Sequence, residues 1–129
     1  MAIAYWCILI ASLLPYIWVF IAKRGPRYDN SDPRGWLAKQ DNPRAHRANS
    51  AQFNAFEAFA PFTAGVLMAQ FAGVEPRSIT LLALVFIACR VLHGVFYISN
   101  VHVLRSLCWL GGFACVSWLM VDAALHIAG

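Results

Sequence analysis

The sequence predicts an all-α integral membrane protein, an antiparallel four-helix transmembrane bundle. Three observations support this class. Of the 129 residues, 60% are hydrophobic and only 12% are charged, about half the charged fraction of an ordinary soluble domain. The apolar residues fall into four long runs, each long enough to cross a bilayer. Most of the basic residues are concentrated in one connecting segment. Residues 1–129 are therefore expected to form one membrane domain.

The first predicted span covers residues 2–22. At 1.5 Å per residue such a helix is about 30 Å long, which matches one hydrocarbon thickness. No positive charge precedes it and no small-residue cleavage site precedes Lys23, so we expect a retained span and not a cleaved signal peptide. The segment 23–46 contains many Gly, Pro, Asn and Asp residues and is predicted to be a loop.

Three more spans are predicted beyond this loop, at residues 47–73, 78–99 and 103–127. A short turn with Gly73 and Pro76 separates the second span from the third, and a turn around Asn100 separates the third from the fourth. Connections this short make consecutive helices antiparallel neighbours.

The basic residues predict the orientation in the membrane. Seven of the ten Lys and Arg residues lie between Lys23 and Arg47, and loops rich in such residues stay on the cytoplasmic side. Both termini are then expected outside. A nucleic-acid site is not expected, because Asp29, Asp32 and Asp41 dilute the charge and no binding motif is present.

The cysteines and histidines do not predict a metal site. None of the four cysteines or four histidines has the spacing of a metal-ligand motif. The cysteines all lie in apolar runs, so they are interpreted as reduced thiols that pack as small hydrophobic side chains. They are Cys7, Cys89, Cys108 and Cys115.

The third span carries a polar stripe made of Arg90, His93 and Tyr97. At about 100° per residue, these side chains fall within roughly 60° of one another on a helix. A charge at the centre of a bilayer costs roughly 2.5 to 3.5 kcal/mol even on lenient scales. The stripe is therefore predicted to face the bundle interior, where it can hold something polar.

A second polar stripe lies on the second span and includes Arg47, Ser50, Asn54 and Glu57. Glu57 and Arg90 have opposite charges. Two interpretations stay open: an ion pair that only holds helices together, or two walls of a ligand site.

Arg105 stands at the start of the fourth span beside Ser106, with no acidic neighbour. A helix N-terminus disfavours a cation, so Arg105 either reaches toward water or binds an anionic ligand. With the predicted orientation, most polar residues of the spans converge on the cytoplasmic half. Asp122, near the outer end of the fourth span, is the exception and is given no catalytic role.

Residues 47–61, RANSAQFNAFEAFAP, resemble the second-helix signature of the MAPEG family, the membrane-associated proteins of eicosanoid and glutathione metabolism. Arg90, His93 and Tyr97, followed by Arg105-Ser106, are similar to that family's pattern R-x-x-(H/Y)-x-x-x-Y followed by R-S. The resemblance covers nearly the whole chain and is strongest with members of bacterial type, which implies the bacterial inner membrane.

The resemblance implies a homotrimer that binds glutathione as co-substrate between neighbouring subunits, in the cytoplasmic half of the membrane. Arg105 would face the sulfur as the catalytic cation, with Ser106 beside it. The binding residues implied by the resemblance are Arg47, Asn54, Glu57, Arg90, His93 and Tyr97, with Glu57 on the ammonium group.

The function implied is a glutathione-dependent transferase or peroxidase acting on lipophilic electrophiles or hydroperoxides. The family's arginine four residues before the asparagine is Ser50 here. This departure favours an alternative, a non-catalytic lipid-binding or scaffold protein of the same fold. A transporter or channel is a weaker third interpretation, because the charges cluster in one half and do not line a path across the membrane.

Overall fold

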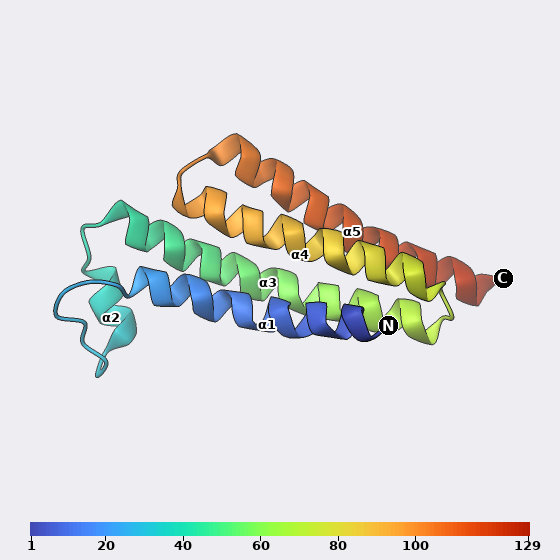
Figure 1. Ribbon diagram of the computed structural model, residues 1–129. Coiled ribbons are helices and arrows are strands. Elements are labelled where there is room, and N and C mark those ends of the chain that lie inside the picture. Colours follow the sequence, from blue (N-terminus) through green and yellow to red (C-terminus); the bar gives the residue numbers. More distant parts are fainter.

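The computed structural model describes residues 1–129 and contains helices and no strands (Figure 1). The prediction of an all-α protein is therefore confirmed. The elements, in chain order, are α1 (Ala2–Ala22), α2 (Pro33–Ala38), α3 (Pro43–Phe71), α4 (Pro76–Ile98) and α5 (His102–Ala128).

The four long helices lie side by side along most of their length (Figure 1). α3 and α4 occupy the centre, because each of them packs against the other three long helices. Both termini lie at one end of the molecule, while α2 and the turn between α4 and α5 lie at the other. This arrangement brings the polar halves of α3, α4 and α5 together near the α2 end.

Local capping sets the starts of α3 and α4. The Asn42 side chain accepts a hydrogen bond from the Arg44 amide at 3.0 Å, and Pro43 occupies the first turn. α3 therefore begins four residues before the predicted span. The Glu75 carboxylate accepts from the Ser78 amide at 2.8 Å, so α4 also begins earlier than predicted. Capping residues and an N-terminal proline favour these starts, whereas apolar content marks only the membrane part of a helix.

The prediction that residues 23–46 form only a loop is wrong at α2. Asp32 caps this short helix by accepting a hydrogen bond from the Gly35 amide at 3.0 Å, and Pro33 follows at its first position. Leu37 is buried with Trp18 and Ala22 of α1, so the segment folds against the end of the bundle. The Asp-Pro pair was a readable helix-start signal.

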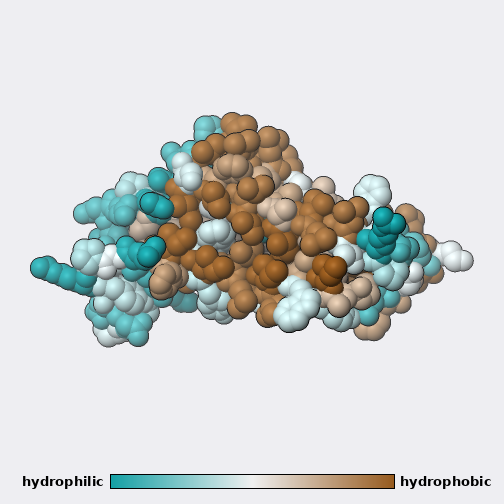
Figure 2. All heavy atoms as spheres, in the orientation of Figure 1, coloured by the Kyte–Doolittle hydropathy of each residue, from teal (hydrophilic) through white to brown (hydrophobic).

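Three of the long helices, α1, α4 and α5, are long and apolar enough to cross a membrane. Large apolar side chains remain exposed on them, for example Trp6 at 64% and Trp118 at 64%. Figure 2 shows this surface as a broad hydrophobic region with hydrophilic residues gathered mainly at its ends. So much exposed apolar surface needs a lipid environment, and the protein is an integral membrane protein. α3 is long enough at 29 residues but more polar, so its crossing stays a prediction.

Close packing at two places fixes the helices around the polar residues. The rings of Phe62 on α3 and Phe86 on α4 stack at 3.9 Å between centroids. Gly94 on α4 lies directly against the indole of Trp18 on α1, where an added Cβ would come within 2.2 Å of the ring. These contacts hold α4 against both α1 and α3, next to Arg90 and His93.

Candidate functional site

Arg90 and Asn54 form the central polar contact of the bundle. Arg90 Nη2 donates a hydrogen bond to Asn54 Oδ1 at 2.7 Å, and Arg90 is only 4% exposed. The bond links α4 to α3. A hydrogen bond to a charged group contributes about 1.5 to 3 kcal/mol, so Asn54 stabilises a guanidinium that is withdrawn from water.

The ion pair between Glu57 and Arg90 that the sequence suggested as one interpretation is not formed. The structure has one contact within 4.0 Å between a carboxylate and a basic side chain, and it joins Asp122 to His126 at the far end of α5. Glu57 is exposed, and Asn54, one turn earlier on α3, takes the guanidinium in its place. The Glu57 carboxylate is therefore free to bind a ligand.

A cavity of about 200 Å³ lies between α3, α4 and α5, with Glu57, Asn54 and Arg90 forming its polar side. The rest of its wall is mainly apolar and consists of Ala58, Pro61, Phe86, Trp109, Gly112, Phe113 and Val116. The lining of the cavity thus includes both an unpaired carboxylate and several aromatic rings.

A larger groove of about 440 Å³ adjoins this cavity and shares Asn54 and Trp109 with it. The other residues that line the groove are His93, Tyr97, Arg105, Ser106 and Leu110. The cavity and the groove together include seven of the eight residues singled out from the sequence. Arg47 is the exception.

Arg105 is positioned by an aromatic ring and not by a carboxylate. Its guanidinium carbon lies 4.6 Å from the centroid of the Tyr97 ring, a cation–π distance. The Tyr97 ring in turn meets the His93 ring edge to face at 5.6 Å. This explains how a cation is held near the start of α5, and it leaves the charge of Arg105 available to an anion in the groove.

His93 is buried at 3% exposure, and its Nδ1 atom has no hydrogen-bond partner. Buried polar atoms without a partner are uncommon in folded proteins, and each needs an explanation. Other atoms of the His93 side chain line the groove, whereas the Nδ1 atom itself is buried within the protein.

Arg47, which the family resemblance implies as a binding residue, forms a contact within the chain. Its Nε donates to the carbonyl oxygen of Ile98 at 3.1 Å, and it lines neither the cavity nor the groove. The last carbonyl groups of a helix lack partners within the helix, so Arg47 acts as a cap for the C-terminal end of α4. Its role here is to hold α3 and α4 together.

Trp109 was missed by the sequence interpretation although it lines both the cavity and the groove. Its ring stacks on Phe113 with a centroid distance of 5.3 Å and an interplanar angle of 5°. The signal was present, since Arg105, Trp109 and Phe113 follow one another at four-residue intervals. Residues at that spacing share one helix face.

The arrangement suits a small ligand that carries both signs of charge. Arg105 makes the groove attractive to carboxylate or thiolate groups. Glu57 offers the opposite charge at the neighbouring cavity. An apolar molecule can approach along the wall formed by Trp109 and Phe113, which also borders the surface that contacts lipid.

Comparison with known proteins agrees with this picture. A model of the MAPEG family matches residues 3–125, nearly the whole chain. No curated protein matched the sequence in a similarity search. The match spans all five helices except for single residues of α1 and the last turn of α5. On this match, and with the apolar helical fold, the chain belongs to the MAPEG family.

Proposed function

We propose that the protein is a glutathione-dependent membrane enzyme, a transferase or peroxidase that directs the glutathione thiolate at lipophilic electrophiles or hydroperoxides. One observation carries the proposal. Polar residues from three helices meet in an adjoining cavity and groove, in a chain that belongs to a family of glutathione-related membrane proteins.

Glutathione carries groups of both charges, and the site offers both. The exposed Glu57 carboxylate binds the ammonium group, and Arg105, the cation that lines the groove, attracts the anionic groups. The His93 side chain, which lines the groove, contacts the peptide portion. Asn54 borders both compartments, so its amide positions the tripeptide between them while its oxygen stays on Arg90.

Arg105 is the residue that activates the glutathione thiol. A free thiol has a pKa of about 8.5 and is mostly protonated at pH 7. A guanidinium near the sulfur stabilises the thiolate and lowers the thiol pKa. Arginine keeps its own proton, so Arg105 acts electrostatically and the thiol proton leaves through the open groove. The Ser106 hydroxyl donates a hydrogen bond to the thiolate.

The thiolate then attacks a molecule dissolved in the bilayer. With an electrophile, a carbon–sulfur bond forms and the leaving group departs with its electron pair. With a hydroperoxide, the thiolate attacks the terminal oxygen and the O–O bond breaks. The alkoxide that leaves takes a proton from water, which gives an alcohol and glutathione sulfenic acid. A second glutathione converts the sulfenic acid to the disulfide and water.

The proposed assembly is a homotrimer of four-span subunits in the bacterial inner membrane, with the α2 end cytoplasmic and both termini outside. The packing of α3 against α1, α4 and α5 supports its crossing, because most of its polar side chains in the membrane region, Glu57 excepted, are then at least partly shielded from lipid. The exposed apolar faces of the outer helices supply surface for lipids and for neighbouring subunits.

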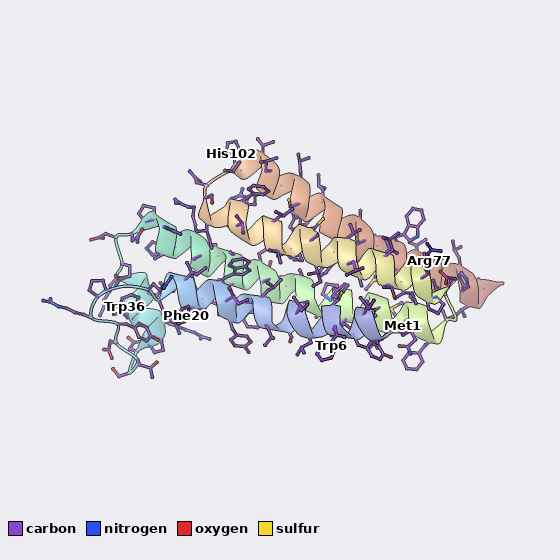
Figure 3. All side chains as sticks on the ribbon, in the orientation of Figure 1. Met1, Trp6, Phe20, Trp36, Arg77 and His102 are labelled. Atoms are coloured by element: carbon purple, nitrogen blue, oxygen red, sulfur yellow. The ribbon has the colours of Figure 1, made fainter.

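The test is a conjugation assay on protein purified in detergent, with saturating glutathione and a chloronitrobenzene substrate. Arg105→Gln should lower kcat by about a hundredfold, as expected when one preorganised electrostatic group is lost. Arg77→Gln is the matched control. Arg77 lies at the opposite end of the molecule (Figure 3), and its loss should leave the rate unchanged. No activity of the wild type toward several electrophiles and a hydroperoxide would contradict the proposal.

One observation favours a second candidate, a non-catalytic lipid-binding or scaffold protein of the same fold. Ser50, half-buried on α3, replaces the arginine of the family motif, so one cation for a glutathione carboxylate is missing. Thermal unfolding with and without glutathione separates the two candidates, because a ligand that binds the native state raises its stability. No shift at millimolar glutathione, together with a shift in Ser50→Arg, would support the second candidate.

A further inference from the structure

The end of the molecule that carries α2 holds the entire net charge of the protein. We define the basic cap as residues 23–47, which contain seven cationic side chains and the acidic residues Asp29, Asp32 and Asp41. Elsewhere three arginines and three acidic residues cancel, so the formal charge of +4 belongs to the cap. Its cations are Lys23, Arg24, Arg27, Arg34, Lys39, Arg44 and Arg47.

The cations of the basic cap are not neutralised within the molecule. None of them lies within 4.0 Å of a carboxylate, since the structure's one contact of that kind is between His126 and Asp122. Two of the acidic residues are occupied locally. Asp32 caps α2 through the Gly35 amide, and Asp29 accepts hydrogen bonds from the amide and hydroxyl of Ser31 at 2.9 and 2.6 Å.

The cap is folded into a fixed shape. Trp36 Nε1 donates to the Arg27 carbonyl at 3.0 Å, and Gln40 Nε2 donates to the Trp36 carbonyl at 2.9 Å. The Tyr28 ring meets the Trp36 ring edge to face at 5.1 Å. Because these contacts hold the backbone, the cations lie on an ordered surface. Arg24, Arg34 and Arg44 are all exposed on it.

Aromatic rings lie among these cations at the end of the candidate membrane span α1. Phe20 is 66% exposed in the last turn of α1, and the Arg24 guanidinium lies 5.7 Å from its ring. Lys23 Nζ lies 5.6 Å from the Tyr28 ring. Phe20 and Trp36 occupy the same end of the molecule (Figure 3). Amphipathic aromatic rings next to Lys and Arg, directly after an apolar span, are typical of the lipid headgroup region.

We propose that the basic cap binds anionic phospholipid headgroups of the leaflet that it faces. The phosphate of each lipid contacts the unpaired guanidinium groups, and the acyl chains lie along the exposed apolar face of α1. A nucleic acid or an acidic protein would use the charge, but it would not use the exposed apolar span that directly adjoins the cap. The proposal does not depend on glutathione binding.

The experiment compares the affinity of the full-length protein in neutral detergent for phosphatidylglycerol and for phosphatidylcholine with the same acyl chains, measured by native mass spectrometry. The wild type should prefer phosphatidylglycerol, with a preference that falls at high salt. Replacing Arg24, Arg34 and Arg44 together by Gln should reduce the phosphatidylglycerol affinity by about a hundredfold, at about fivefold for each cation.

Matched variants exclude other causes. The corresponding triple Lys variant keeps the charges and should keep the preference, and Arg77→Gln at the opposite end should not change it. Circular dichroism confirms that the triple Gln variant is folded. Equal affinity of the wild type for both lipids, an unchanged affinity in the triple Gln variant, or competition by equimolar soluble glycerol phosphate would overturn the proposal. So would tighter binding of an oligonucleotide than of phosphatidylglycerol.

Discussion

At the scale of single residues, Asn54 connects stability with the proposed chemistry. Its oxygen accepts from the buried guanidinium of Arg90, and its side chain borders both the cavity and the groove. A buried arginine without an acceptor is strongly destabilising. The stability of the bundle and the shape of the proposed ligand site therefore both depend on Asn54.

Replacing Asn54 by Ala should lower the stability by about 2 kcal/mol, because the Arg90 guanidinium loses a charge-assisted hydrogen bond in a buried place. Thermal unfolding in detergent measures the change. Asn54→Asp restores an oxygen acceptor and should recover most of the loss. Equal destabilisation by both substitutions would show that the hydrogen bond to Arg90 is not the cause.

The sequence predicted which polar residues face the bundle interior better than it predicted which of them contact one another. The polar stripes of α3 and α4 followed from helical spacing and from the high free energy of a charge in lipid. Spacing alone could not decide whether Arg90 meets Asn54 or Glu57, because both lie on the same face of α3 one turn apart. The contact of Arg105 with the Tyr97 ring and the capping role of Arg47 depend on side-chain directions that periodicity does not contain.

At the scale of elements, two buried glycines differ in how closely a neighbouring helix approaches them. A Cβ at Gly94 would come within 2.2 Å of the Trp18 ring, whereas a Cβ at Gly112 would meet Arg90 and Phe86 at ordinary distances of 3.6 and 3.7 Å. The first glycine is required by the packing of α4 on α1. The second leaves room at the cavity wall.

The two glycines make a matched pair for a test. Gly94→Ala should destabilise the bundle by about 1 to 3 kcal/mol, because Trp18 is forced out of its packed position. Gly112→Ala should be neutral or stabilising by up to about 1 kcal/mol, since alanine favours a helix over glycine. Unfolding temperatures of both variants in the same detergent provide the measurement. Similar values for both would contradict the close approach of α1 and α4.

The sequence predicted the presence of the long helices better than the residues at which they begin and end. The long apolar runs predicted the bounds of α1, α4 and α5 to within a few residues. α3 and α4 start earlier than predicted because Asn42 and Glu75 cap them, and polar capping turns carry no apolar signal. α2 was missed because its six residues are too few for a periodic pattern, and its place depends on burial of Leu37 against the bundle.

At the scale of the whole molecule, the proposed assembly is a homotrimer, and the exposed apolar side chains of α1 and α5 are expected to contact lipid and neighbouring subunits. Native mass spectrometry of the protein released from detergent should give three times the chain mass of 14.3 kDa. A monomer at all detergent and protein concentrations would contradict the assembly. Composition alone predicted the membrane class, but no pattern in a single chain reports how many copies associate.

The central claim is that Arg105 stabilises the thiolate of bound glutathione, and an ultraviolet titration of glutathione bound to the purified protein tests it most directly. In the wild type the thiol pKa should fall well below its ordinary value of about 8.5, so that thiolate is present at pH 7 and forms as the pH rises through the lowered pKa. In Arg105→Gln the pKa should return toward the ordinary value. No binding of glutathione at millimolar concentration, or an equal thiol pKa in both proteins, would contradict the account.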